Sequence, residues 1–338
     1  MTILLDNDIN QIADILAGYG APAYRSGQLY KWLLAGVGIE GMTDIPLPLR
    51  ENISRDFVLV PAKIAKRLKS KDGTVKYLFG LHDGNIVEGV LMKYKHGRTL
   101  CLSVQVGCRM GCVFCASGAD GLVRNLTAGE ILGQVIAAGA DTGGRVTNLV
   151  LMGSGEPLDN YDNTVKFLRL VTDSRGLGIS RRNISLSTCG LSGGIRRLAD
   201  EGLAVNLSVS LHATTDANRQ KIMPVARKYS IAAVMDAVRY YFEQTGRRVI
   251  IEYCLTKENT TAHDVKRLAE LTRGLSCHVN LITLNAAPKS GSVTGCTKEE
   301  AKTFSDRLTS ANVSNTIRRS MGADIEGACG QLRRRHAK

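Results

Sequence analysis

The chain has 338 residues, of which 44% are hydrophobic, so it is long enough to bury a substantial core. Glycine is frequent (35 residues) and proline is scarce (7), which favours an ordered fold with many turns over a disordered chain. The formal net charge of +13 favours polyanionic partners, nucleic acid first, although a basic protein without such a partner carries the same charge.

The nine cysteines are an odd number, spread along a long chain. The N-terminal segment carries acids and no basic stretch typical of a secretory signal, and no apolar segment approaches the length of a membrane span. We therefore expect a cytoplasmic protein that contacts no membrane. In a reducing compartment, clustered cysteines indicate metal binding or catalysis rather than structural disulfides.

The first part of the chain predicts helices. Apolar residues recur at helical spacing over 8–16 and 28–34, and Asp6 or Asn7 is a candidate cap for the first helix. Basic side chains gather in this part and at its exit, namely Arg25, Lys31, Lys63, Lys66, Arg67, Lys69 and Lys71. We predict a basic helical RNA-binding domain over residues 1–73.

The pattern then changes to strands. TVKYLFGL and IVEGVLMKY flank the turn sequence HDGN, which predicts a β-hairpin, expected to form a linker over residues 74–100. A further strand, TLCLSVQVG, leads into three closely spaced cysteines.

From there on, apolar strands rich in β-branched residues alternate with helical segments. The expected strands are CLSVQV, VTNLVLM, ISLST, AVNLSVSL, VIIEYCL and HVNLITL. Such alternation implies parallel strands joined by right-handed crossovers. Six repeats predict an α/β fold, a partial (β/α)6 barrel over residues 101–320, with a loop and basic tail over 321–338. Functional residues are then expected at the C-terminal ends of the strands.

Three cysteines, Cys108, Cys112 and Cys115, form a C-x3-C-x2-C motif after the first of these strands. Three thiolates on one short loop can bind three irons of a 4Fe–4S cube, whereas most electron-transfer clusters take four cysteines. The fourth iron is then open to chelate a small molecule such as S-adenosylmethionine (SAM), through its amino and carboxylate groups. A zinc site is the alternative, but zinc favours four ligands from paired knuckles, and the sequence has no second knuckle.

Polar residues end several of the following strands. Gly155 lets a ligand approach the backbone closely, and Glu156 can accept a hydrogen bond from the ammonium group of SAM. The next two strands end in Ser187 and in Ser210 with His212, which could bind ribose or carboxylate. Turn capping explains each of these residues when it is taken alone.

Two isolated cysteines and one acid also stand out. Cys101 lies on the strand that leads into the triad, and Cys329 lies in GACGQL, where small neighbours let a loop reach a distant site. Both could be buried small hydrophobic residues, the interpretation that we favour for Cys254 and Cys277. Glu88, within IVEGV, either faces solvent or serves proton transfer, and the sequence slightly favours solvent.

These motifs together resemble the bacterial radical SAM methyltransferases that methylate an adenine of RNA, the RlmN/Cfr family. The resemblance extends over nearly the whole chain, including RSGQLYKWLLAG, SVQVGCRMGCVFCASG, GLVRNLTAGEILGQV, MGSGEPLDN, LSTCG, SVSLHA, CHVNLITLN and TIRRSMGADIEGACGQL. The cysteine triad marks only the superfamily, whereas Cys101 paired with GACGQL is specific to this family. GLVRNLTAGEI and LSTCG favour the carbon-2 branch, RlmN, over the carbon-8 branch that confers antibiotic resistance, Cfr.

The resemblance implies a radical SAM barrel with one 4Fe–4S cluster, held by Cys108, Cys112 and Cys115, whose open iron chelates SAM. It implies SAM contacts at Gly155, Glu156, Ser187, Ser210, Leu211, His212 and Asn285. It also implies that Cys329 becomes an S-methylcysteine, that Cys101 is its redox partner and that Glu88 accepts a proton.

The scheme implied by the resemblance uses two SAM molecules per turnover. One SAM methylates Cys329, and the second, reduced by the cluster, yields a 5′-deoxyadenosyl radical that takes hydrogen from the S-methyl group. The carbon radical adds to the adenine, and Glu88 removes the ring proton. Cys101 then attacks the sulfur of Cys329, which releases the methylated base and leaves a disulfide.

The implied substrates are an adenine in the peptidyl transferase region of 23S rRNA and the adenine beside the anticodon of certain tRNAs. An external donor such as flavodoxin or ferredoxin would supply electrons, and a monomer is expected. Two alternatives stay open: a carbon-8 methyltransferase and, in a different class, a non-catalytic iron–sulfur protein that binds RNA or senses redox state.

Two segments depart from the family pattern. Ser154 stands where the family usually has Met, and AAPKSGSVTGCTKEE, after Asn285, lacks the usual Asn-Pro and Tyr-x-Arg-Pro-Ser pattern. The second segment should approach RNA or close over the site, and Cys296 within it has no assigned role. Late basic residues that could contact phosphates are Arg318, Arg319, Arg333, Arg334, Arg335 and Lys338.

Overall fold

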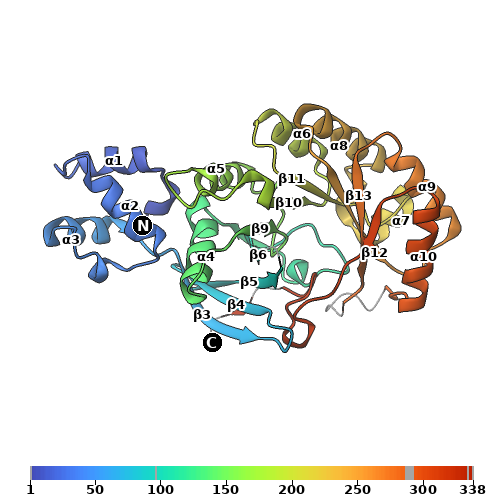
Figure 1. The fold of residues 1–338 in the computed structure, drawn as a ribbon, viewed down its shortest axis with the longest axis horizontal. Coiled ribbons are helices and arrows are strands. Elements are labelled where there is room, and N and C mark those ends of the chain that lie inside the picture. The colour runs from blue at the N-terminus through green and yellow to red at the C-terminus, as the bar shows by residue number, and fades with distance from the viewer. Residues whose placement is uncertain (1, 96, 286–292, 333–334, 337–338) are drawn as a thin grey trace.

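The computed structural model describes residues 2–95, 97–285, 293–332 and 335–336 (Figure 1). Its N-terminal part consists of the helices α1 (Ile9–Ala17), α2 (Arg25–Leu34) and α3 (Leu47–Asp56), with the short parallel strands β1 (Thr2–Ile3) and β2 (Phe57–Val58). These helices lie at one end of the molecule, as Figure 1 shows. No helix in the described part of the chain is long and apolar enough to span a membrane.

The cap of α1 differs from the prediction. Asp8 is the N-cap, because its carboxylate accepts the N–H groups of Asn10 and Gln11. Asp6 instead accepts the N–H of Gly129 at 2.7 Å, in the first turn of α4 (Ala128–Asp141). The residue expected to cap the first helix therefore ties the N-terminal part to the rest of the molecule.

One large sheet contains most of the other strands. Its antiparallel part consists of β3 (Ala62–Lys69), β4 (Val75–Leu81), β5 (Asn85–Tyr94) and β6 (Gly97–Cys101). The predicted hairpin is confirmed as β4 and β5. The sequence did not predict β3, a strand with mostly exposed basic side chains. The division of the chain into domains stays a prediction.

The parallel part of the sheet begins at β6, which pairs with β5 on one side and with β9 on the other. It continues in the order β9 (Asn148–Leu151), β10 (Ile184–Thr188), β11 (Asn206–Ser210), β12 (Val249–Leu255), β13 (Cys277–Thr283) and β14 (Asn315–Ile317). Among the described strands, no pairing joins β14 to β3, so the sheet is open. The sequence missed β14, which has only three residues.

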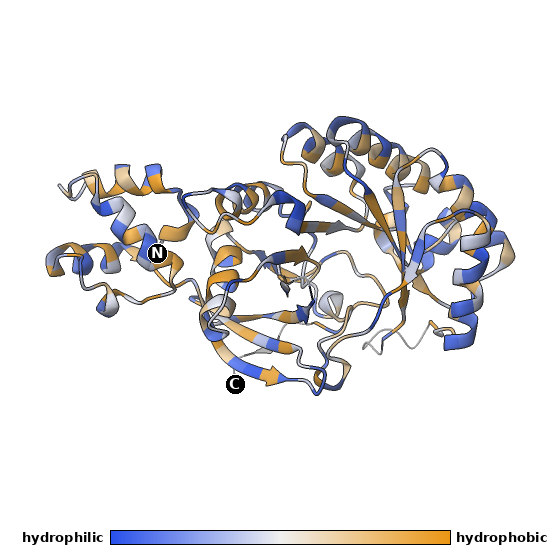
Figure 2. Ribbon diagram, viewed as in Figure 1, coloured by the Kyte–Doolittle hydropathy of each residue, from blue (hydrophilic) through white to orange (hydrophobic). Residues whose placement is uncertain are grey.

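Helices follow the parallel strands and cover the outer side of the curved sheet (Figure 1). After α4 they are α5 (Tyr161–Thr172), α6 (Ser192–Asp200), α7 (Asp216–Ile222), α8 (Ile231–Thr245), α9 (Ala262–Thr272) and α10 (Lys298–Ser310). The predicted α/β fold with a partial (β/α)6 barrel is confirmed. Figure 2 shows hydrophobic residues along these strands and hydrophilic residues on outer helices such as α10.

The segment between β6 and β7 (Gln105–Gly107) is held by backbone hydrogen bonds, such as that from the N–H of Leu102 to the carbonyl of Val150 on β9, and also by side chains. Gln134, on α4, accepts the N–H of Ser103 at 3.1 Å and donates to its carbonyl at 2.9 Å. The hydroxyl of Ser103 donates to the carbonyl of Glu88 at 2.6 Å and accepts the N–H of Ser154 at 2.9 Å. These contacts fix the chain that joins Cys101 to the triad.

We expect Gln134→Ala to lower the free energy of unfolding by about 3 kcal/mol, because a buried N–H and a buried carbonyl of Ser103 lose their partners. Denaturant unfolding followed by circular dichroism measures this change. The control is Gln244→Ala on the exposed side of α8, with an expected change within about 0.5 kcal/mol. Equal effects of the two substitutions would contradict the role given to Gln134.

Candidate functional site

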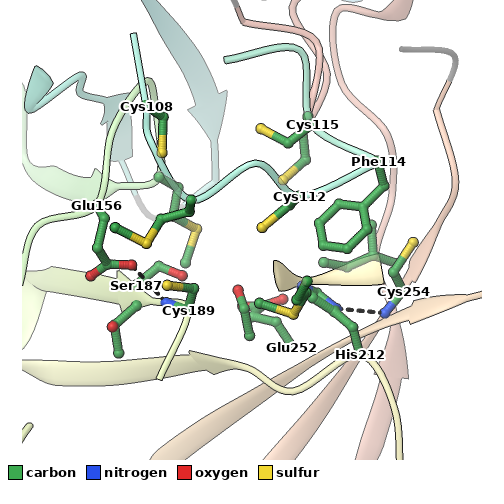
Figure 3. Close-up of a pocket in the computed structure, with 18 of the residues that line it drawn as sticks. Cys108, Cys112, Phe114, Cys115, Glu156, Ser187, Cys189, His212, Glu252 and Cys254 are labelled. Carbon is green, nitrogen blue, oxygen red and sulfur yellow. Dashed lines mark hydrogen bonds between the residues drawn. The ribbon is translucent and has the colours of Figure 1, made fainter. Parts of the chain in front are cut away.

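A pocket opens at the C-terminal ends of the parallel strands (Figure 3). The space in it and its mouth that no atom fills, open solvent included, is about 920 Å³. Most of the residues predicted to bind the cluster or SAM or to carry the methyl group line this pocket, namely Cys108, Cys112, Cys115, Gly155, Glu156, Ser187, Ser210, His212, Asn285 and Cys329. The structure thus brings together residues that are up to 221 positions apart, from Cys108 to Cys329.

The cysteine triad lies on one loop, and its three side chains point toward a common space in Figure 3. The loop begins at Gly107, whose φ of +80° favours glycine, and a Cβ there would lie 2.0 Å from the carbonyl oxygen of Gly121. The N–H of Cys108 donates to that same carbonyl at 3.0 Å. The close backbone approach therefore sets where the first thiol projects.

The three thiols of the triad line one pocket. In the part of the chain that the structure describes, no three His, Cys, Asp or Glu side chains are grouped closely enough to bind one metal ion. A 4Fe–4S cube takes each thiolate on a different iron, so its ligands stand farther apart than those of one zinc ion. Burial raises the pKa of Cys108 to about 12, and it raises that of Cys112 well above the usual value. Bound metal would supply the positive charge that deprotonation of these thiols requires.

Glu156 follows β9 and is almost fully buried. Its carboxylate accepts the N–H of Leu158 at 3.0 Å and that of Cys189 at 2.7 Å, while its own N–H donates to Gln105. Burial raises its pKa, and the two backbone donors oppose this shift. Each carboxylate oxygen keeps a lone pair for a further donor from the pocket.

His212 lies just beyond β11 and is held in a left-handed conformation, with φ of +58°. Its Nδ1 accepts the N–H of Cys254 at 2.9 Å, and the ring of Phe114 meets it edge-on at 4.7 Å. Burial, with a smaller effect from Arg219, lowers the pKa of His212 to about 3. A neutral imidazole whose Nδ1 accepts must carry its proton on Nε2. Leu211, the neighbouring residue, does not line the pocket and contributes backbone hydrogen bonds.

The Cys329 loop is attached directly to the triad loop. The N–H of Ala116 donates to the carbonyl of Gly330 at 2.7 Å, and the hydroxyl of Ser117 donates to the carbonyl of Leu332 at 2.6 Å. The amide of Asn285 donates to the carbonyl of Cys329 at 3.1 Å. These bonds hold Cys329 at the wall of the pocket.

Cys101 and Cys329 both line a second cavity, which adjoins the first and shares Cys329 with it. Cys101 is buried, and this raises the pKa of its thiol to about 12. Cys329 is exposed within its recess, and the surrounding protein raises its pKa as well. The guanidinium of Arg318, which lines both cavities, opposes both shifts and so favours the two thiolates.

The expectation that Glu88 faces solvent is wrong. Its side chain is fully buried, and its carboxylate lies 3.0 Å from Nζ of Lys76, which is fully buried too. Lys76 also donates to the carbonyl of Glu326 at 2.9 Å, close to the Cys329 loop. Glu88 is not among the described residues that line either cavity, but its strand β5 pairs with β6 beside Cys101.

Two charged residues of the pocket, Glu252 and Arg318, were not identified as pocket residues from the sequence, which named Arg318 only as a possible phosphate contact. Glu252, on β12, is 2% exposed, and its Oε1 accepts from Asn280 at 3.1 Å. Its Oε2 lies 3.9 Å from Arg318 and has no hydrogen-bond partner in the described part of the chain. An acid inside the apolar run VIIEYCL was the available signal, as it was for Glu88 in IVEGV.

The departures noted in the sequence are placed only in part. Ser154 is buried, and its hydroxyl donates to the carbonyl of Gly107 at 3.2 Å, so it supports the start of the triad loop. Residues 286–292, 333–334 and 337–338 lie outside the described residues, and with them the first seven residues of the atypical segment and, in the basic tail, Arg333, Arg334 and Lys338. Within the tail, β15 (Arg335–His336) pairs with β5.

Comparisons with known proteins give concordant similarities. Residues 102–272 match the model of the radical SAM superfamily. A protein of Alkaliphilus oremlandii described as a dual-specificity RNA methyltransferase RlmN is 48% identical over 98% of both chains. One of Clostridium perfringens with the same description is 47% identical over 100% of this chain and 98% of its own. The crystal structure of a radical SAM methyltransferase from Sphaerobacter thermophilus has a TM-score of 0.94, with 40% identity, over 98% of this chain and 99% of that chain.

We expect Gly107→Ala to reduce the iron content of the protein purified without oxygen. A Cβ at this position must displace the backbone of Gly121, and the positive φ alone costs about 1–2 kcal/mol. Iron and sulfide analysis, with the visible absorption spectrum, measures the loss. Gly193→Ala, at a helical glycine with no atom within 4 Å of the new Cβ, is the control and should keep its iron. A wild-type iron content in Gly107→Ala would refute the constraint.

Proposed function

The chain belongs to the RlmN family of radical SAM RNA methyltransferases, and from this premise we propose that it methylates carbon-2 of adenine in two RNAs. These are 23S rRNA, in the peptidyl transferase region, and tRNA, at the adenine beside the anticodon. The observation that carries the proposal is the placement of Cys101 and Cys329 around one cavity beside the cysteine triad. The net charge of +13 suits an RNA substrate.

Members of the radical SAM superfamily use a 4Fe–4S cluster and SAM. In this chain we assign the cluster to Cys108, Cys112 and Cys115, with one iron open for SAM, and two SAM per turnover. We assign SAM binding to Gly155, Glu156, Ser187, Ser210, Leu211, His212 and Asn285. When bound, the cluster supplies one electron to SAM for the generation of a carbon-centred radical.

Cys329 is the proposed carrier of the methyl group. Its sulfur forms a bond to the methyl carbon of SAM, while the bond from that carbon to the sulfonium sulfur breaks and the thiol proton is lost. Arg318 supports this step, because its charge favours the thiolate of Cys329. Asn285 and the hydrogen bond from Ala116 to Gly330 keep the cysteine at the pocket wall.

Cys101 is the proposed resolving thiol. Its sulfur attacks that of Cys329 to form a disulfide, while the bond from the Cys329 sulfur to the methyl-derived carbon breaks; the carbon keeps the electron pair and takes a proton from water, which releases the methylated base. An external reductant then restores both thiols. Burial keeps Cys101 protonated at neutral pH, so the nearby Arg318 is again the group that favours the reactive thiolate.

Glu88 is the proposed acceptor of the adenine proton. A carboxylate on β5 stands one strand away from Cys101, and Nζ of Lys76 lies 3.0 Å from it. We further propose that the enzyme acts as a cytoplasmic monomer and that flavodoxin or ferredoxin delivers the electrons.

The function is tested by an anaerobic reaction with an rRNA fragment and SAM whose methyl group carries three deuterium atoms. We expect a carbon-2 methyl group with two deuterium atoms, because one is removed from the S-methyl group before transfer. Mass spectrometry of the adenine, with fragmentation, measures both position and label. Cys329→Ala should give no methylated adenine while it keeps the iron content. A carbon-8 product, or a methyl group with all three labels, would overturn the proposal.

We expect Cys101→Ala to trap RNA covalently on Cys329, because no thiolate remains to release the product. Denaturing gel electrophoresis of the reaction, followed by nuclease digestion and peptide mapping, detects the adduct and its position. Cys277→Ala, at a cysteine that lines neither cavity among the described residues, should show no adduct. Free methylated product at the wild-type rate from Cys101→Ala would exclude the role given to Cys101.

A further inference from the structure

Arg219, on α7, is a fully buried arginine that the proposed mechanism does not use. Its guanidinium donates only to backbone carbonyls in the contacts that the structure describes. Nε donates to Leu211 at 3.1 Å, Nη1 to Tyr229 at 3.1 Å, and Nη2 to Cys189 at 2.6 Å and to Ser210 at 3.2 Å. Three of these carbonyls belong to the ends of β10 and β11, where the pocket begins.

This buried cation has no anionic partner in contact with it. Within the described part of the chain, no carboxylate forms an ion pair with Arg219. Asp216 is near enough to act on its charge, but the Oδ1 of Asp216 accepts the N–H of Ile231 at 2.7 Å. Carbonyl dipoles solvate a guanidinium without neutralising it, and a buried net charge is costly unless an opposite charge stands nearby.

The missing negative charge fits the triad loop. The N–H of Val113 donates to the carbonyl of Ile222, the last residue of α7, at 3.0 Å. The carbonyls of Cys189 and Ser210, which accept from Arg219, belong to residues that line the same pocket as Cys112. A cluster bound by three thiolates would therefore bring negative charge to the side of the pocket where this cation lies.

We propose that Arg219 is the fixed counter-charge of the iron–sulfur cluster and that it raises the reduction potential of the cluster by stabilising the reduced state. The inference rests on the proposed assignment of the cluster to Cys108, Cys112 and Cys115. Reduction adds one electron to a centre that already carries three thiolates. A positive charge inside the low-dielectric interior favours that electron more strongly than a surface charge would. Arg219 is thus a positioning and tuning residue that touches neither SAM nor RNA.

A purely structural role makes a different prediction. If Arg219 only joined the ends of β10 and β11 to α8 through its hydrogen bonds, its loss would change the free energy of unfolding. It would not change the reduction potential of the cluster. If Arg219 is a counter-charge, the reduction potential of the cluster depends on the positive charge at this position and not on the hydrogen bonds. Arg219→Lys keeps the positive charge but loses the planar guanidinium and its set of hydrogen-bond donors, whereas Arg219→Gln loses the charge.

The experiment is a reductive titration of the full-length, cluster-loaded protein with dithionite and mediators, without RNA or SAM, followed by EPR of the reduced cluster. We expect Arg219→Gln to lower the ratio of reduced to oxidised cluster at a fixed potential at least about tenfold, which is about 59 mV for a one-electron couple. Arg219→Lys should stay within about threefold of the wild type. Arg239→Gln removes an arginine that also binds carbonyls, those of Leu271 and Arg273, and is the control, with no shift expected.

If Arg219→Gln fails to assemble a cluster, Asp216→Asn tests the same proposal. The amide keeps an acceptor for Ile231 and removes a negative charge near Arg219, so the reduced fraction should rise. An unchanged potential in Arg219→Gln with full iron content, or in Asp216→Asn, overturns the inference. Absence of any 4Fe–4S signal from the wild type would instead refute the proposed function, so the two failures are distinguishable.

Discussion

The hydrogen bond of 2.7 Å from the N–H of Ala116 to the carbonyl of Gly330 joins the two parts of the site that are farthest apart in the sequence. It attaches the loop of the proposed methyl carrier, Cys329, to the loop of the cysteine triad. A cysteine that must meet a methyl donor, a radical and a nucleic acid base in turn has to stay near one place while its partners change. Backbone hydrogen bonds provide this, because they hold the loop without engaging the thiol.

The open parallel sheet supplies the rest of the pocket. Parallel strands place their C-terminal ends at one edge, so side chains from β9 to β13 converge there without any proximity in sequence. Three of them are buried and charged or polar, and each is held by a hydrogen bond: backbone N–H groups donate to Glu156 and His212, and Asn280 donates to Glu252. Fixed dipoles of this kind need no rearrangement when charge develops.

Charge in this interior is sparse and specifically placed. Burial disfavours the thiolates of Cys101, Cys108 and Cys112, so every step that needs a thiolate needs a cation or a metal beside it. Arg318 lines both cavities, as Cys329 does, whereas Arg219 donates to the carbonyls of Cys189 and Ser210, which line the same pocket as the triad. Arg318 favours the reactive thiolates, whereas Arg219 is the proposed counter-charge of the reduced cluster. The buried Lys76–Glu88 pair repeats this arrangement at the hairpin.

The sequence by itself determined the triad, the isolated cysteines, the family and the order of strands and helices, because these depend on local spacing and on motifs that a single chain carries. It missed β3 and β14, whose patterns are basic or very short, and it placed Glu88 in solvent. Only the tertiary structure decided which charges face one another. The burial of Glu88 depends on Lys76, and the role of Arg219 depends on carbonyls from three separate segments. A charged side chain is buried only where other groups pair with it, and the residues next to it in the sequence do not show which groups these are.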